Sequence, residues 1–208
     1  MKFPRSRILV FAKAPEPGTV KTRLIPLLGK QETAKLHTRF VHNTLDMICR
    51  ANLAPAELWC SPSIDAAFFQ DCRQRFLITL HQQPSGDLGH RMHLAIRSSL
   101  GRSQSAVLVG ADCPGLCAAD LTEAFEVLDR GAGAVLGPAR DGGYYLIGLK
   151  QPNPRLFDIP GWGTATVLAD TVKRLEETGI EYHCLTVRDD VDTPEDYLRI
   201  TPETSASG

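Results

Sequence analysis

The sequence predicts a three-layer α/β/α fold around a mixed, mostly parallel central sheet. Short apolar segments alternate with longer ones in which apolar residues recur every three or four positions, as in strands separated by helices. The first short segment, 8–12, is apolar throughout, which is typical of a strand buried on both faces. We predict one domain over residues 1–200 and a flexible polar tail at 201–208.

The expected strands are rich in branched, aromatic or leucine side chains and are bounded by turn residues. They are 8–12, 56–60, 76–81, 106–111, 134–137, 144–149 and 182–187. The expected helices carry an apolar stripe of helical period, or begin with cap residues as at Thr193-Pro194. They are 31–50, 64–75, 91–100, 121–130, 164–179 and one that begins at 194. Strands 134–137 and 144–149 are joined too closely for a helical crossover, so we expect antiparallel neighbours.

Composition favours a protein that acts on a small molecule. The 43% hydrophobic content of the 208 residues is ample for a packed core. A net charge of −1 provides no field that attracts nucleic acid or an anionic membrane. The apolar run near the start is too short for a secretory segment, and the six cysteines are scattered. We therefore expect a cytoplasmic protein with reduced thiols, and neither a nucleic acid nor a membrane as partner.

Cysteine and histidine spacings do not indicate a metal site. Cys113 and Cys117 lack a second pair at zinc-finger spacing. The histidine pairs 37/42 and 90/93 fall on predicted helices, where we interpret them as exposed polar positions.

A basic loop follows the first strand. It contains Lys13, Lys21 and Arg23, with Gly18 and Thr22 between them. Loop N–H groups and cations that converge after a buried strand are a common way to hold phosphates, so we predict a nucleotide-phosphate loop. The alternative is a solvated turn, and neither the Walker pattern nor Gly-x-Gly-x-x-Gly is present.

Two aspartates are candidate metal ligands. Asp112 follows the most hydrophobic predicted strand, and ligands bind beyond the carboxyl ends of such strands in open parallel sheets. A carboxylate there could hold Mg²⁺ or Mn²⁺ together with substrate phosphates, or it could cap the next turn. Asp192 could reach the same metal or simply favour the dipole of the helix that follows.

Two glycine-rich turns are candidate ligand loops. Gly86 and Gly89 flank Asp87 and allow close backbone approach to a flat ligand, although Asp87 could also be an ordinary helix cap. In the second turn, Gly142 and Gly143 follow Asp141, and turn chemistry alone is the alternative explanation.

Trp162 lies between Gly161 and Gly163 in a predicted irregular stretch. It is either a stacking platform for an acceptor or a core residue.

Six segments in this order resemble the DUF2064 family of glycosyltransferase-like proteins over nearly the whole chain. They are AKAPEPGTVKTRL, GDLGHRM, GADCPGL, PARDGGYYLIGL, Trp162-Gly163-Thr164 and VDTPEDY. The resemblance implies a GT-A, nucleotide-diphospho-sugar transferase fold, related to phospholactate and molybdenum-cofactor guanylyltransferases.

The resemblance also implies roles for particular residues. The first loop (Gly18, Lys21, Thr22 and Arg23) would bind nucleotide phosphates, Gly86 and Gly89 the nucleobase, and Asp112 the metal. The turn 141–143 would face the acceptor.

These residues support three hypotheses, all with a small-molecule ligand. In the first, a metal-dependent glycosyltransferase uses a nucleotide-sugar donor: Lys21 and Arg23 stabilise the departing diphosphate, and Asp141 orients or deprotonates an acceptor hydroxyl. In the second, a nucleotidyltransferase joins a nucleoside triphosphate to a phosphorylated substrate. In the third, the chain binds nucleotides without turnover. We favour the first on family grounds, and the sequence does not indicate an oligomeric state.

Overall fold

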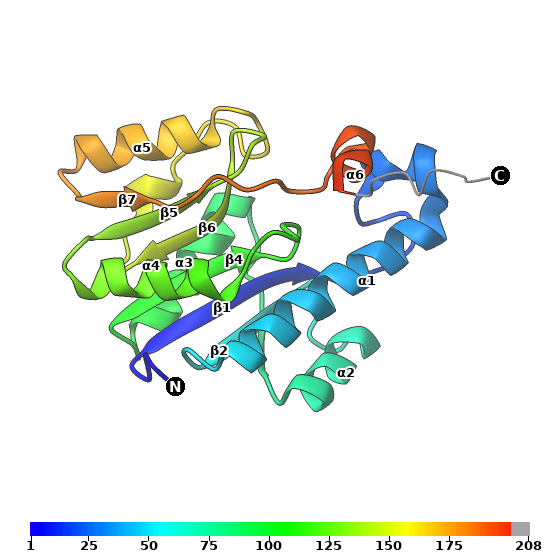
Figure 1. The fold of residues 1–208 in the computed structure, drawn as a ribbon, viewed down its shortest axis with the longest axis horizontal. Helices are drawn as coiled ribbons and strands as arrows, with labels where there is room; N and C mark the ends of the chain where they lie inside the picture. Colours follow the sequence, from blue (N-terminus) through cyan, green and yellow to red (C-terminus); the bar gives the residue numbers. More distant parts are fainter. Residues whose placement is uncertain (201–208) are drawn as a thin grey trace.

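The computed structural model describes residues 1–200, whose seven strands form one sheet in the order β3-β2-β1-β4-β6-β5-β7 (Figure 1). The strands are β1 (Ser6–Lys13), β2 (Ala56–Ser61), β3 (Thr79–Gln82), β4 (Ser105–Gly110), β5 (Ala134–Pro138), β6 (Tyr144–Leu149) and β7 (Tyr182–Cys184). β6 is antiparallel to both neighbours, β4 and β5, and the other pairs are parallel. The mixed, mostly parallel sheet and the antiparallel β5–β6 pair are as predicted.

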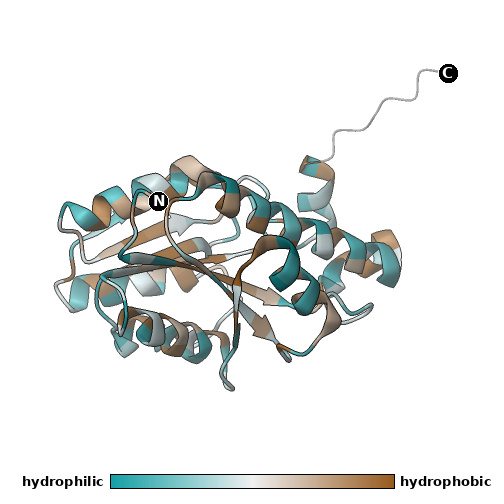
Figure 2. Cartoon of the chain, turned by 90° about the horizontal axis from the view of Figure 1, so that it is seen from below, coloured by the Kyte–Doolittle hydropathy of each residue, from teal (hydrophilic) through white to brown (hydrophobic). Residues whose placement is uncertain are grey.

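Helices cover both faces of the sheet, so the predicted three layers are confirmed. The α-helices are α1 (Ile25–Ala51), α2 (Ala67–Phe76), α3 (Leu88–Leu100), α4 (Ala118–Asp129), α5 (Val167–Glu177) and α6 (Pro194–Ile200), with 3-10 helices η1 (Thr22–Leu24) and η2 (Pro154–Phe157). α1, α2 and α4 pack on one face, and α3 and α5 on the other. Figure 2 shows largely hydrophobic strands between helices that carry both hydrophobic and hydrophilic residues.

The central strand β1 supplies apolar side chains to both layers. Ile8 and Val10 join the core under α1 and α4, whereas Leu9 joins the core under α3. All three are fully buried. Alternate residues of a strand point to opposite faces, so a continuous apolar run matches a strand covered on both sides.

The C-terminal helix docks far from its neighbours in sequence. Val191 packs with Leu24, Leu36 and Phe40 in a small cluster that also receives Tyr197. Figure 1 shows α6 beside the beginning of α1. This contact brings the segment before α6 to the basic loop after β1.

Several element boundaries differ from the prediction. Phe76 ends α2 rather than beginning β3, because Leu77 turns the chain in a left-handed conformation (φ 51°). α1 begins at Ile25, ahead of the expected start, and a break at Gly29 (φ 76°) separates its first turn from the remainder. β7 ends at Cys184, earlier than expected.

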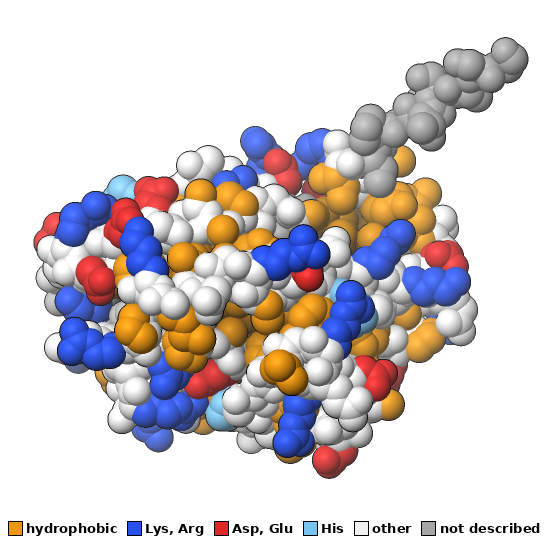
Figure 3. Space-filling view, turned by 60° about the horizontal axis from the view of Figure 1, so that its bottom comes forward, with side chains coloured by type: hydrophobic (Ala, Val, Ile, Leu, Met, Phe, Trp, Pro, Cys, Tyr) orange, Lys and Arg blue, Asp and Glu red, His pale blue; other side chains and the backbone are white. Residues whose placement is uncertain are grey.

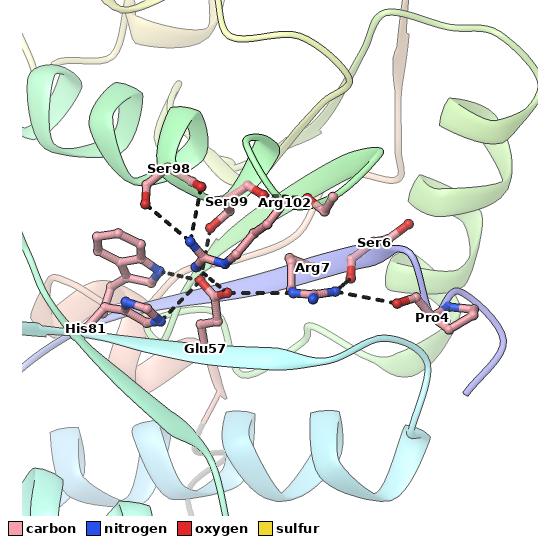
Figure 4. Close-up of polar contacts among 10 residues, drawn as sticks. Pro4, Ser6, Arg7, Glu57, His81, Ser98, Ser99 and Arg102 are labelled. Carbon is pink, nitrogen blue, oxygen red and sulfur yellow. Dashed lines mark hydrogen bonds and ion pairs between the residues drawn. The ribbon is translucent and has the colours of Figure 1, made fainter.

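A buried carboxylate, Glu57, joins three strands and a helix (Figure 4). Arg102 donates to it at 2.6 Å and Ser99, on α3, at 2.9 Å. Arg7 of β1 forms an ion pair with it at 3.8 Å, and His81 Nε2 of β3 lies 3.7 Å from its Oε2. Glu57 lies in an otherwise apolar strand, and no local sequence pattern indicates the network.

Replacing Glu57 by Ala is expected to lower the free energy of unfolding by about 1–3 kcal/mol, because buried Ser99 loses its acceptor and the partly exposed Arg102 loses its carboxylate partner. Urea denaturation of the purified chain measures this. Glu126→Ala, which removes a carboxylate from the exposed pair with Lys2, is the matched control and is expected to leave the midpoint nearly unchanged. Equal midpoints for both variants would contradict the role assigned to Glu57.

The surface carries mixed charges. On the face shown in Figure 3, Lys and Arg side chains are interspersed with hydrophobic and acidic ones. Among residues 1–200, no helix has the length and apolar character that crossing a bilayer requires. The tail predicted at 201–208 lies outside the described residues.

Candidate active site

A cleft of about 440 Å³ opens where β1, β2 and β4 end. Lys13, Ser61 and Asp112 line it from these strand ends, opposite the first turns of α3 and the loop before α5. Of the residues predicted from sequence, the cleft is lined by Lys13, Asp112, Asp141, Gly143, Trp162 and Asp192. The position agrees with the rule that ligands bind beyond the carboxyl ends of parallel strands.

Lys21 lies beneath this cleft with its side chain only 2% exposed. Its ammonium donates to the Val191 carbonyl at 2.7 Å and lies 2.9 Å from Asp112 Oδ1 and 3.9 Å from Asp192 Oδ1. The residue adopts a left-handed backbone (φ 45°), which is costly for a side chain other than glycine. The geometry thus places Lys21 as a cation that joins the two candidate metal ligands to the C-terminal segment.

Asp112 makes polar contacts with Lys21, His37 and Val191. Its carbonyl accepts from Val191 N–H at 3.0 Å, and His37 Nδ1 lies 3.6 Å from Oδ1. Burial opposes ionisation of this carboxyl, but Lys21 and His37 hold the pKa of Asp112 well below its usual range. Half of the side chain remains exposed toward the cleft, so an ionised carboxylate is presented there.

Asp192 is the second carboxylate that contacts Lys21. Its Oδ2 accepts from exposed Arg23 at 3.1 Å. Within residues 1–200, no three His, Cys, Asp or Glu side chains are grouped so that they could hold a metal ion together. Since Mg²⁺ is usually held by one or two carboxylates plus substrate phosphates, this pair fits an ion that arrives with a diphosphate better than a resident ion.

Asp141 and Asp190 also line the cleft: Asp141 follows β5, and Asp190 precedes Val191, whose N–H donates to the Asp112 carbonyl. Asp141 Oδ1 accepts from Gly143 N–H at 2.8 Å, as in an ordinary aspartate turn. Burial and the neighbouring Asp141 carboxylate raise the pKa of Asp190 to about 6. Two carboxylates therefore face the ligand space together.

Gly142 serves the packing of this turn. It has a positive φ of 90°, and an added Cβ would come within 2.1 Å of the Ala165 carbonyl oxygen. Its own carbonyl accepts from Leu168 N–H at 2.9 Å. The turn is therefore fixed against the loop that carries Trp162.

Trp162 packs on the first turn of α3. An added Cβ at Gly89 would lie 2.3 Å from Trp162 Nε1, so glycine permits the close approach of the indole. Trp162 both joins the core cluster under α3 and lines the cleft. Asp87 caps α3 by accepting from His90 N–H at 2.8 Å, the ordinary alternative considered for this loop.

A polar group borders the β1 and β2 ends of the cleft. Gln83 donates to the carbonyls of Ala12 and Trp59 at 3.2 and 2.8 Å and accepts from Arg91 at 3.0 Å. Lys13 donates to the Thr19 carbonyl at 2.9 Å. Of the described residues, Lys13 and Arg91 are the only Lys or Arg side chains that line the cleft.

Some residues that the sequence predicted for the site do not line the cleft. Gly18, Thr22 and Gly86 are not among the described residues that line it. Gly18 (φ 89°) shapes the basic loop, and Gly86 (φ 115°) lies close to His90. Lys21 and Arg23 reach the site through Asp112 and Asp192.

Sequence reasoning missed several lining residues: His37, Gln83, Arg91, Tyr144 and Asp190. The expectation that His37 is exposed was wrong, since it is 5% exposed with Nε2 2.9 Å from the Lys13 carbonyl oxygen. Arg91 offered a signal, because it is a cation on the first turn of a helix that follows a glycine loop.

Comparisons with known proteins agree with this architecture. The family model "Uncharacterized protein conserved in bacteria (DUF2064)" matches residues 44–164, more than half of the chain. A solved structure from Desulfovibrio desulfuricans G20, with the provisional name nucleotide-diphospho-sugar transferase, is 32% identical, with a TM-score of 0.87. The match covers 99% of this chain and 90% of that one. A comparison with curated proteins gave no match.

More distant structures share the fold alone. A cytidylyltransferase from Leptospira borgpetersenii serovar Hardjo-bovis is 12% identical with a TM-score of 0.62, covering 95% of this chain and 85% of that one. CMP:2-keto-3-deoxy-manno-octonic acid synthetase in complex with CTP is 11% identical with a TM-score of 0.59, covering 94% and 96%.

The chain has a nucleotide-sugar transferase-like or nucleotidyltransferase-like fold, and its structural neighbours are transferases. Within this class, the chain belongs to the DUF2064 family.

Proposed function

We propose that the protein is a metal-dependent glycosyltransferase that moves a sugar from a nucleotide-sugar donor to the hydroxyl of a small acceptor. The observation that carries the proposal is the division of charge across the cleft. Lys13 lies at the end of β1 and Arg91 bonds to Gln83 beside β2, whereas the second side, at the turn after β5, carries Asp141 with Asp190 as its neighbour. Among residues 1–200, no Lys or Arg lines that second side.

This division supports a neutral acceptor. A phosphorylated acceptor, as in the nucleotidyl-transfer hypothesis stated above, would meet two carboxylates without a lining cation, and like charges repel strongly in a partly buried site. A hydroxyl acceptor instead needs a proton acceptor close by, which a carboxylate provides. Asp141 is the proposed base and Asp190 its neighbour.

The residues that line the cleft have three separate roles in the proposed reaction: they bind the metal, the nucleotide and the acceptor. Asp112 and Asp192 would hold Mg²⁺ or Mn²⁺, which neutralises charge on the diphosphate when bound. Lys13 and Arg91 would bind the nucleotide side, and Gln83 positions Arg91. The acceptor hydroxyl loses its proton to Asp141 as its oxygen forms a bond to the sugar carbon, and the bond from that carbon to the diphosphate breaks.

A donor panel tests the proposal. Thermal shift with UDP- and GDP-sugars, each with and without Mn²⁺, is expected to show metal-dependent stabilisation by at least one nucleotide sugar. Slow release of its nucleoside phosphate in water should accompany binding. Stabilisation by free triphosphates alone, with pyrophosphate release, would instead establish nucleotidyl transfer. Binding that is unaffected by metal and yields no product would indicate a nucleotide-binding module.

A further inference from the structure

The part of the cleft near Asp141 has an apolar wall. It is formed by Leu88 and Met92 of α3, Leu108 of β4, Val167 at the start of α5, and the rings of Tyr144 and Trp162. The two rings meet edge to face with centroids 6.3 Å apart. This compartment is continuous with the carboxylates that face the acceptor.

The polar atoms on this wall are turned away from the cleft. Trp162 Nε1 is buried and has no hydrogen-bond partner among the described residues, because the indole edge lies against Gly89. The Tyr144 hydroxyl is also buried, which raises the pKa of this phenol. Thr164 Oγ1 already donates to the Gly161 carbonyl at 2.8 Å.

A ligand in this compartment therefore contacts apolar side chains. A hydroxyl placed against this wall, away from the carboxylates, would lose its water without gaining a hydrogen bond from the wall, and each unpaired hydroxyl costs binding free energy. An alkyl or aryl group of similar size loses nothing and gains the transfer free energy of its buried surface. Trp162 packs against Gly89 of α3 and against the rings of Tyr144 and Phe157, so the wall is preformed.

We infer that the acceptor is an alcohol with an alkyl or aryl body that fills the compartment formed by Leu88, Met92, Leu108, Tyr144, Trp162 and Val167. Its hydroxyl would extend toward Asp141. This inference deepens the proposed function and rests on it, because it takes the Asp141 side of the cleft as the acceptor side.

Titration of the chain without nucleotide or metal tests the compartment directly. Trp162 fluorescence reports occupancy, since the other tryptophan, Trp59, is buried in the core. With 1-propanol to 1-hexanol as probes, the dissociation constant is expected to fall about fourfold per added methylene until the wall is filled. 2-Phenylethanol should bind, whereas glucose at equal concentration should not. Glucose binding as tight as that of 2-phenylethanol would overturn the inference.

Paired variants assign the binding to this compartment. Leu88 lies on the wall and is 38% exposed at the start of α3, so Leu88→Ser is expected to fold and to weaken 2-phenylethanol binding about fivefold. Leu27→Ser, at a similarly exposed leucine outside the cleft, should have the wild-type dissociation constant. Equal affinities in both variants would place the probe elsewhere and overturn the inference.

Failure of this inference is distinguishable from failure of the proposed function. Calorimetric titration with the nucleotide sugars and Mn²⁺ is run on the same preparation. If a nucleotide sugar binds and the alcohols do not, the apolar acceptor is wrong and the glycosyl-transfer proposal stands. If the alcohols bind and no nucleotide sugar does, the compartment is established and the proposed function fails.

Discussion

Asp112→Asn is expected to lower the rate of nucleoside diphosphate release from the selected donor by about a thousandfold. The amide keeps the size of the side chain but loses the charge that a hard divalent cation requires, and it leaves Lys21 beside a neutral group. Removal of one strongly placed electrostatic partner costs about a hundred- to a thousandfold in other enzymes. Initial rates at saturating donor measure the effect.

Two further measurements attribute the loss to the metal. Calorimetry of Mn²⁺ in the presence of the nucleoside diphosphate should lose its saturable signal in Asp112→Asn. Asp46→Asn removes a carboxylate that pairs with Arg50 on the surface of α1, and it should keep both rate and metal affinity. An Asp112→Asn rate within tenfold of wild type would exclude Asp112 as a metal ligand.

Lys21→Met is expected to lower kcat/KM about a hundredfold, although Lys21 does not line the cleft. Methionine keeps the apolar stem but loses the ammonium that joins Asp112 to the Val191 carbonyl. Asp112 and Asp192 then repel each other without a cation between them. Steady-state kinetics with varied Mn²⁺ should show a raised metal requirement.

The double variant distinguishes positioning from direct donor binding. If Lys21 acts through Asp112, then Lys21→Met in the Asp112→Asn background should cost little more than Asp112→Asn alone. If the two losses multiply instead, Lys21 contacts the donor phosphates independently, as the sequence had suggested. A normal metal requirement in Lys21→Met would also reject positioning.

The fold followed from the sequence because its signals are local. The unbroken apolar run at 8–12 and the short turn between β5 and β6 each have one structural interpretation. Element ends were less predictable, since the left-handed turn at Leu77 and the break at Gly29 depend on tertiary packing that overrides local propensity.

The site was only partly predictable for the same reason. Asp112 was identifiable because it follows a strongly apolar strand. The contact between Lys21 and the Val191 carbonyl spans 170 positions in sequence, so no local pattern reveals it. His37 and Glu57 were missed because a buried polar side chain resembles an exposed one until its partners are known. Asp190 was hidden in an acidic run whose other members flank a helix start.

The Lys21 ammonium also makes the two ends of the chain interdependent. It joins a loop near residue 20 to the carbonyl just before α6, and Val191 packs beside it among side chains from α1. A ligand that strengthens the contacts of Asp112 and Asp192 therefore also stabilises the packing of α6 against α1, by thermodynamic linkage. Proteases that cut near residue 190 would consequently act more slowly on the ligand-bound protein, and loosening of α6 would release the ligand.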